Sequence, residues 1–201
     1  MMLAPWFITA AAMSLLAKTT DAQTVGTKSR SAGFFVGGAL EGNRSLTVDF
    51  LPDVRSGGGA GVLIGYGFTP QWSLYSQFDV TRIATSDDPN HRTVFALLDL
   101  GTRIHFRTGP NVVVPFIEVG VTGQVDFDRA GDIVSSRSGS GLSVGGGFNA
   151  HFNPAWAFST AMTWTFGNFN SFKVDKQTVD HDPVEVTTGR IHLGLVWFPR
   201  G

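Results

Sequence analysis

The sequence of 201 residues lacks cysteine and has few charged residues. Without cysteine the chain can form neither disulfides nor thiolate metal sites, and it has no cysteine nucleophile. Charged residues make up 15 % of the chain, against about 25 % in ordinary soluble domains. The 15 basic and 16 acidic residues give a net charge of −1, so no basic surface is expected to bind nucleic acid.

Long apolar runs are also missing, except at the amino terminus. Residues 3–17 are mostly apolar and precede a polar stretch, 18–23, with small residues at Thr20 and Ala22. This pattern predicts a secretory signal peptide cleaved after Ala22, although no Lys or Arg precedes the run. An uncleaved anchor helix is the alternative, but the run is shorter than the roughly 20 apolar residues that a spanning helix needs. We expect a signal peptide over 1–22, a periplasmic segment over 23–31 and one domain over 32–201.

Glycine (25 residues) and phenylalanine (17 residues) are abundant, and the chain beyond residue 31 alternates between apolar and small or polar residues. A period of two residues predicts strands whose two faces meet different surroundings. Eight such runs are present, and they predict an all-β fold of eight antiparallel strands: 32–42, 58–68, 72–84, 93–106, 112–128, 141–152, 156–168 and 187–198.

The connections between these runs alternate in length. Three are short and contain proline (69–71, 107–111 and 153–155), and they follow the second, fourth and sixth runs. The others are longer and polar: 43–56, 86–92, 129–140 and 173–185. Short turns on one side and long loops on the other are typical of outer-membrane barrels, whose tight turns face the periplasm.

The two faces of each run decide what surrounds the barrel. One face of the seventh run carries large apolar residues, whereas the opposite face carries alanine, serine, threonine and glycine: Trp156, Phe158, Met162, Trp164 and Phe166 against Ala157, Ser159, Ala161, Thr163, Thr165 and Gly167. A small polar face suits the crowded interior of a narrow barrel. We therefore expect an up-and-down transmembrane β-barrel with its apolar face in lipid, since only a closed sheet leaves no unpaired edge in hydrocarbon.

Two sets of residues stand out on these faces. An aromatic girdle is expected at the periplasmic ends of the strands, where aromatic rings favour the interface between headgroups and tails: Phe34, Phe68, Trp72, Phe106, Phe152, Trp156 and Trp197. Ionisable residues on the inward face are expected to form an interior charge network, since a buried charge must be paired: Asp79, Asp99, Arg103, Glu118, Arg190 and His192, with Glu41 and Asp126 on the same face.

Three segments resemble recurring pieces of the small OmpA-like and OmpX-like outer-membrane barrels. They are Gly65-Tyr66-Gly67-Phe68-Thr69-Pro70-Gln71-Trp72-Ser73-Leu74, Val114-Pro115-Phe116-Ile117-Glu118-Val119-Gly120 and Gly145-Gly146-Gly147-Phe148-Asn149. The resemblance implies an eight-stranded barrel in the cell outer membrane, in contact with bilayer lipid and lipopolysaccharide. The alternation Ile191, Leu193, Leu195, Trp197 looks like the terminal signal by which this family engages the barrel-assembly machinery.

The expected role is non-enzymatic, with a side-chain-filled interior and exposed loops that contact surfaces or ligands. A lipid A-modifying enzyme is one alternative, but Ser143 and Ser159 have no histidine neighbour at matching depth, and His181 has no evident nucleophile. A narrow, low-conductance pore is another, and eight strands leave little room for one. No cofactor, catalytic residue or metal site is expected, because no short ligand spacing unites His105, His151 and His192.

Overall fold

The computed structural model describes residues 32–48, 52–83, 91–106, 112–130, 133–175, 177–179 and 182–199. The signal peptide and periplasmic segment predicted over 1–31 lie outside these residues. Nine strands occur in the described part: β1 (Gly33–Val48), β2 (Pro52–Gly67), β3 (Trp72–Ile83), β4 (His91–His105), β5 (Val113–Ala130), β6 (Ile133–His151), β7 (Trp156–Val174), β8 (Gln177–Val179) and β9 (Val184–Trp197). No helix among the described residues has the length and apolarity needed to cross a membrane.

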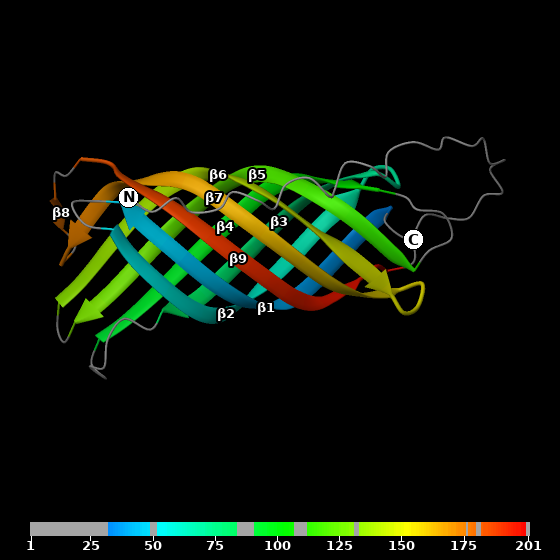
Figure 1. Cartoon of the computed structure of the whole chain (residues 1–201), viewed down its shortest axis with the longest axis horizontal. Coiled ribbons are helices and arrows are strands. Elements are labelled where there is room, and N and C mark those ends of the chain that lie inside the picture. Colours follow the sequence, from blue (N-terminus) through cyan, green and yellow to red (C-terminus); the bar gives the residue numbers. More distant parts are fainter. Residues whose placement is uncertain are drawn as a thin grey trace, which may run out of the picture.

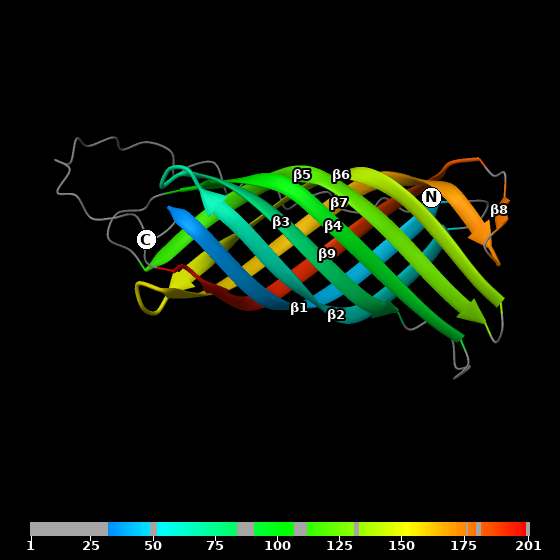
Figure 2. The ribbon, with the colours of Figure 1, turned by 180° about the vertical axis from the view of Figure 1, so that it is seen from behind.

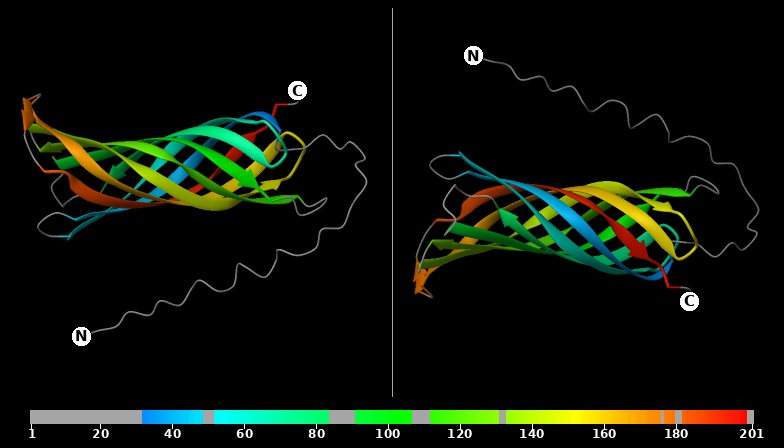
Figure 3. Two further views of the ribbon diagram at one scale, coloured as in Figure 1. Left: turned by 90° about the horizontal axis from the view of Figure 1, so that it is seen from above. Right: turned by 90° about the horizontal axis from the view of Figure 1, so that it is seen from below.

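The strands close into a barrel (Figures 1 and 2). Each long strand pairs antiparallel with its neighbours in the order β6-β5-β4-β3-β2-β1-β9-β7, and the pairing of β6 with β7 joins the two ends. The short β8 forms a hairpin with the end of β7 and projects at the end opposite the C-terminus (Figure 3). The predicted eight-stranded antiparallel barrel is therefore confirmed, with one additional short strand outside the wall.

Two tight turns at one end are shaped by their own side chains. Thr69 Oγ1 accepts hydrogen bonds from the backbone N–H groups of Gln71 and Trp72, at 3.2 and 3.0 Å. Asn153 Oδ1 accepts two bonds of 2.8 Å from Ala155 and Trp156 in the same way. Threonine and asparagine stabilise turns by such local bonds, and the proline that follows each sets the backbone angle. We call this end of the barrel the short-turn end and the opposite end the long-loop end.

The strands run further toward the long-loop end than the sequence predicts. Residues 43–56 and 129–140 were expected as loops, but β1 pairs with β2 up to Val48 and Pro52, and β5 pairs with β6 up to Ala130 and Ile133. Cross-strand hydrogen bonds continue there without a buried apolar face. Several strands of 15–19 residues exceed the roughly nine to eleven that a tilted strand needs to cross a bilayer. These strands are therefore longer than a bilayer crossing requires.

Side chains alternate between the two faces of the wall as predicted. Outward apolar residues are about half exposed, for example Phe158 at 42 % and Trp164 at 40 %, whereas Ala161 and Thr163 between them are buried. The outward face of the wall is thus apolar over the half nearest the short turns. Outward-pointing charges are found instead near the long-loop end: Arg44, Arg82, Arg129, Lys173 and Glu185.

The interior is not uniformly small and polar, and here the sequence-based picture needs correction. Large apolar side chains form a turn-end plug (Phe35, Leu63, Tyr75, Ala157, Val196 and Phe198) and a loop-end plug (Ile83, Phe95, Leu97, Phe169 and Val186). Gly65 makes room for the first, because a Cβ there would collide with the ring of Phe35. Along β3 the buried polar residues Gln77, Asp79 and Thr81 lie between Tyr75 of the first plug and Ile83 of the second.

Candidate functional site

The centre of the barrel holds a fully buried arginine bound by carboxylates. Arg190 on β9 has no solvent-exposed surface. Its Nη1 lies 2.9 Å from Asp79 Oδ2 and 2.5 Å from Asp99 Oδ2, and its Nη2 donates to Thr165 Oγ1 at 3.0 Å. Asp99 also accepts a hydrogen bond from Thr122. These contacts join strands β3, β4, β5, β7 and β9 across the lumen, so Arg190 cross-links most of the wall.

His192 and Glu41 extend this cluster toward β1. His192 Nε2 lies 3.1 Å from Asp79 Oδ2 and 2.8 Å from Gln77 Nε2. Glu41, which is paired in register with His192, accepts one bond of 3.3 Å from Asn43 Nδ2. We call Glu41, Asp79, Asp99, Arg190 and His192 the central cluster. Coulomb forces are strong in this water-poor layer, so each charge depends on its neighbours.

A second ion pair lies between the central cluster and the turn-end plug. Arg103 Nε donates to Glu118 Oε2 at 2.8 Å, and the two residues are directly paired between β4 and β5. Thr163 Oγ1 donates to the other oxygen of Glu118 at 2.6 Å. The Arg103 guanidinium carbon also lies 4.6 Å from the ring centroids of both Tyr75 and Phe116. Both carboxylate oxygens of Glu118 therefore accept a hydrogen bond. The cation–π contact of Arg103 with Tyr75 links this ion pair to the turn-end plug.

All six residues of the predicted charge network point into the lumen, where the structure groups them as two clusters. Arg190 contacts Asp79 and Asp99, while Arg103 contacts Glu118 separately. The seven girdle aromatics are outward and 39–62 % exposed, at strand ends beside the short turns. Trp156 and Trp197 face each other in register, with ring centroids 6.3 Å apart.

Some interior contacts were not predicted from the sequence. Ser73 Oγ lies 3.0 Å from His105 Nε2, both residues are buried, and His105 Nδ1 has no hydrogen-bond partner. The pairing of β3 with β4 brings them together, although they are 32 positions apart. A serine–histidine pair is the start of a hydrolytic site, but this one has no orienting carboxylate on Nδ1.

A comparison of the sequence with protein-family models identifies the family of this chain. The family model of the outer membrane protein beta-barrel domain matches residues 7–197, nearly the whole chain. The chain belongs to this outer-membrane barrel family. Its apolar outer wall therefore faces the lipid of the outer membrane, and the short-turn end corresponds to the periplasmic side in barrels of this kind.

Solved structures of outer-membrane proteins share the fold. Neisserial surface protein A (NspA) aligns with a TM-score of 0.62 and 15 % identity, over 83 % of this chain and 97 % of its own. Ail, the attachment invasion locus protein of Yersinia pestis, aligns with 0.56 and 17 %, over 83 % and 98 %. OprG of Pseudomonas aeruginosa aligns with 0.57 and 14 %, over 84 % and 97 %. A comparison with curated protein sequences gives no match.

Proposed function

We propose that this outer-membrane barrel is a sealed scaffold that holds an extended wall and its loops above the cell surface. The observation that carries the proposal is the layered interior. The turn-end plug, the two ion-paired clusters and the loop-end plug follow one another along the lumen. Beside these clusters a pocket lined by Gln77, Arg103 and His192, together with residues of the wall, has a volume of about 20 Å³, room for roughly one water molecule. Such an interior favours a structural role over transport.

The outer part of the wall is the surface that we propose for contacts. Arg44 and Arg82 point outward, each ten positions along its strand from the girdle residues Phe34 and Trp72, about the height at which we expect the headgroups of the outer leaflet. Cations at this level attract the phosphates of lipopolysaccharide, which is the partner we propose for the rim. A polyanionic surface ligand would suit the same charges, and Ail has been solved with the heparin analogue sucrose octasulfate. Assembly by the barrel-insertion machinery, after export by the predicted signal peptide, completes the proposal.

Lipid A hydrolysis and ion conduction are the two alternatives. The Ser73–His105 pair favours lipid A hydrolysis, but both side chains are at most 4 % exposed and face the lumen, away from the lipid. An acyl chain of lipid A therefore has no route to Ser73 in this conformation. Ion conduction would use the charges of the central cluster, but this cluster lies between the two apolar plugs, which oppose the entry of ions.

Reconstitution of the folded protein tests the proposal against both alternatives. In planar bilayers we expect no sustained conductance above that of empty membranes, with a general porin as positive control. In vesicles containing lipid A we expect no release of fatty acid, with a Ser73→Ala variant as matched control. A steady single-channel current would contradict the sealed scaffold, and so would fatty-acid release that the Ser73→Ala variant has lost.

A further inference from the structure

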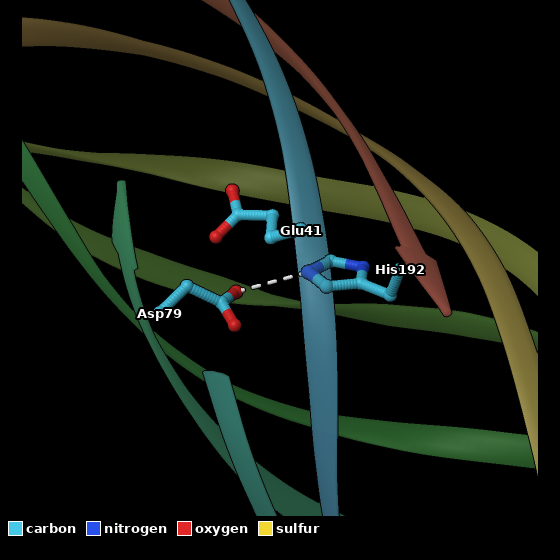
Figure 4. A group of neighbouring side chains, drawn as sticks. All are labelled: Glu41, Asp79 and His192. Atoms are coloured by element: carbon cyan, nitrogen blue, oxygen red, sulfur yellow. Dashed lines mark hydrogen bonds and ion pairs between the residues drawn. The ribbon is translucent and has the colours of Figure 1, made fainter. Parts of the chain in front are cut away.

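Three side chains of the central cluster have the arrangement of a metal site. Glu41 on β1, Asp79 on β3 and His192 on β9 are at most 5 % exposed, and each offers one ligand atom within 4.8 Å of the others. Figure 4 shows the Asp79 carboxylate and the His192 ring facing each other, with the Glu41 carboxylate beside them. His192 Nε2 and Asp79 Oδ2 are 3.1 Å apart, close to the roughly 3.3 Å between two ligands of a tetrahedral zinc ion.

The strand between β1 and β3 is shaped to allow this approach. β2 places Gly59 and Gly61 in register with Glu41 and Asp79. A Cβ at position 61 would collide with Asp79 Oδ1, so any side chain there would displace the carboxylate. Glycine in a strand interior weakens the strand, and it often marks a point of close approach. The missing side chains of β2 thus leave the space in which Glu41 and Asp79 meet.

Two atoms of the group are buried without a hydrogen-bond partner. They are Glu41 Oε2 and His192 Nδ1. Gln77 Nε2 donates to both oxygens of Asp79, at 3.1 and 3.0 Å, and in this amide orientation it also faces His192 Nε2 as a donor. His192 Nε2 also lies 3.1 Å from Asp79 Oδ2, so the ring nitrogen and the carboxylate oxygen face each other. A cation between these two atoms would be bound by both of them and would give Glu41 Oε2 a partner.

The charges of the central cluster also favour a bound cation. Glu41, Asp79 and Asp99 are three carboxylates, and among the residues that the structure describes only the Arg190 guanidinium forms ion pairs with them, to Asp79 and Asp99. Arg103 is engaged by Glu118. Among the described residues, Glu41 contacts no Lys or Arg side chain, and it lies in a layer between the two apolar plugs, where an uncompensated charge is unfavourable. A divalent cation held between Glu41 and Asp79 would compensate carboxylate charge there.

We propose that Glu41, Asp79 and His192 bind a structural Zn²⁺ ion inside the barrel. One imidazole nitrogen with two carboxylate oxygens is a ligand set that zinc accepts, and hard cations such as Mg²⁺ prefer oxygen alone. The cavity of about 20 Å³ beside Gln77 and His192 has room for a water as fourth ligand. Because both ends of the lumen are plugged, the ion enters while the barrel folds and is then held against chelators.

Metal analysis of the refolded protein tests this site. The unfolded chain is folded into detergent micelles with Zn²⁺, washed with EDTA and analysed by elemental mass spectrometry. We expect about one zinc per barrel, retained for hours in EDTA and released once the protein is unfolded. The Glu41→Gln and His192→Gln variants should retain less than a fifth of this amount, whereas the matched control His105→Gln, a buried histidine outside the group, should retain all of it.

Cobalt provides a second readout that does not depend on the variants folding. Wild-type protein folded with Co²⁺ should show the visible absorption bands of a tetrahedral ion with a nitrogen ligand. A folded wild type that retains no zinc and shows no cobalt bands would overturn the proposal and assign the charge balance to protons. Equal zinc retention in wild type and in folded Glu41→Gln and His192→Gln variants would overturn it too, because the metal would then be bound elsewhere.

Discussion

Replacing Arg190 with methionine should lower the free energy of unfolding by about 3–5 kcal/mol, the cost of breaking a buried ion pair from one side. Methionine fills a similar volume but leaves Asp79 and Asp99 without the cation that both contact. Thr165 also loses its partner on Arg190. The measurement is urea unfolding of the protein in lipid vesicles, followed by tryptophan fluorescence and by the heat-modifiable gel shift.

The double variant Arg190→Met/Asp99→Asn separates lost charge balance from lost packing. It removes one positive and one negative charge together, so the central cluster keeps its net charge. We expect it to recover at least half of the stability lost in the single variant. If the double variant loses as much stability as the Arg190→Met and Asp99→Asn single variants together, the two residues act independently. The interior charges then do not form a network.

A charge placed on the lipid-facing wall should be nearly as costly. Leu193 is outward, 51 % exposed and paired with Leu40 and Thr160 midway up the apolar wall. Arginine at this depth should destabilise the folded barrel by about 2–4 kcal/mol, since it faces hydrocarbon. In a protein surrounded by water, the same exposed position would tolerate arginine with little effect.

Leu46→Arg is the matched control for this prediction. Leu46 is also outward and 37 % exposed, but it lies two positions beyond Arg44, near the long-loop end. At an interface the cost of an arginine falls to about 0–1 kcal/mol. Urea unfolding in vesicles of the same lipid compares the two variants directly. Equal costs at Leu193 and Leu46 would mean that the wall has no hydrophobic midplane.

Much of the fold could be read from the sequence because lipid reverses the usual contrast between faces. Large residues such as Phe158 and Trp164 alternate with small ones over most of β7, so the strands and their two faces follow from a period of two, and the alternation of short turns with long loops predicts the up-and-down order. The turns at Thr69 and Asn153 were recognisable because each has a proline directly after a residue that bonds its own backbone.

The extent of the wall could not be predicted in the same way. Residues 43–48 and 133–140 are mainly polar, serine-rich or glycine-rich, and both of their faces meet water or polar groups beyond the membrane. Without an apolar face the period of two is hard to see in the sequence, although the backbone pairing of β1 with β2 and of β5 with β6 continues through these residues. β8 was missed for the same reason, since its three residues are all exposed.

The interior shows a second limit of sequence reasoning. The alternation of side chains along each strand places Asp79, Asp99 and Arg190 inward. It does not give the distances between them across the lumen, because these depend on the register of every strand in between. The same alternation of side chains places Phe95 and Phe169 inward. A rule that assigns every large apolar residue to the lipid would place these two phenylalanines on the wrong face. Their rings pack at 6.4 Å between centroids and close the loop end of the lumen.

Depth-resolved fluorescence of Trp164 tests most directly whether the apolar wall lies in hydrocarbon. Trp164 is eight positions from Trp156 along β7, which places it about 19 Å above the periplasmic girdle for a strand tilted by roughly 45°. The chain from Gln23 onward, with Trp72, Trp156 and Trp197 replaced by phenylalanine, is folded into vesicles with brominated acyl chains. We expect strong quenching by the bromines and little by aqueous acrylamide. Quenching by acrylamide but not by brominated lipid would contradict the membrane-spanning barrel.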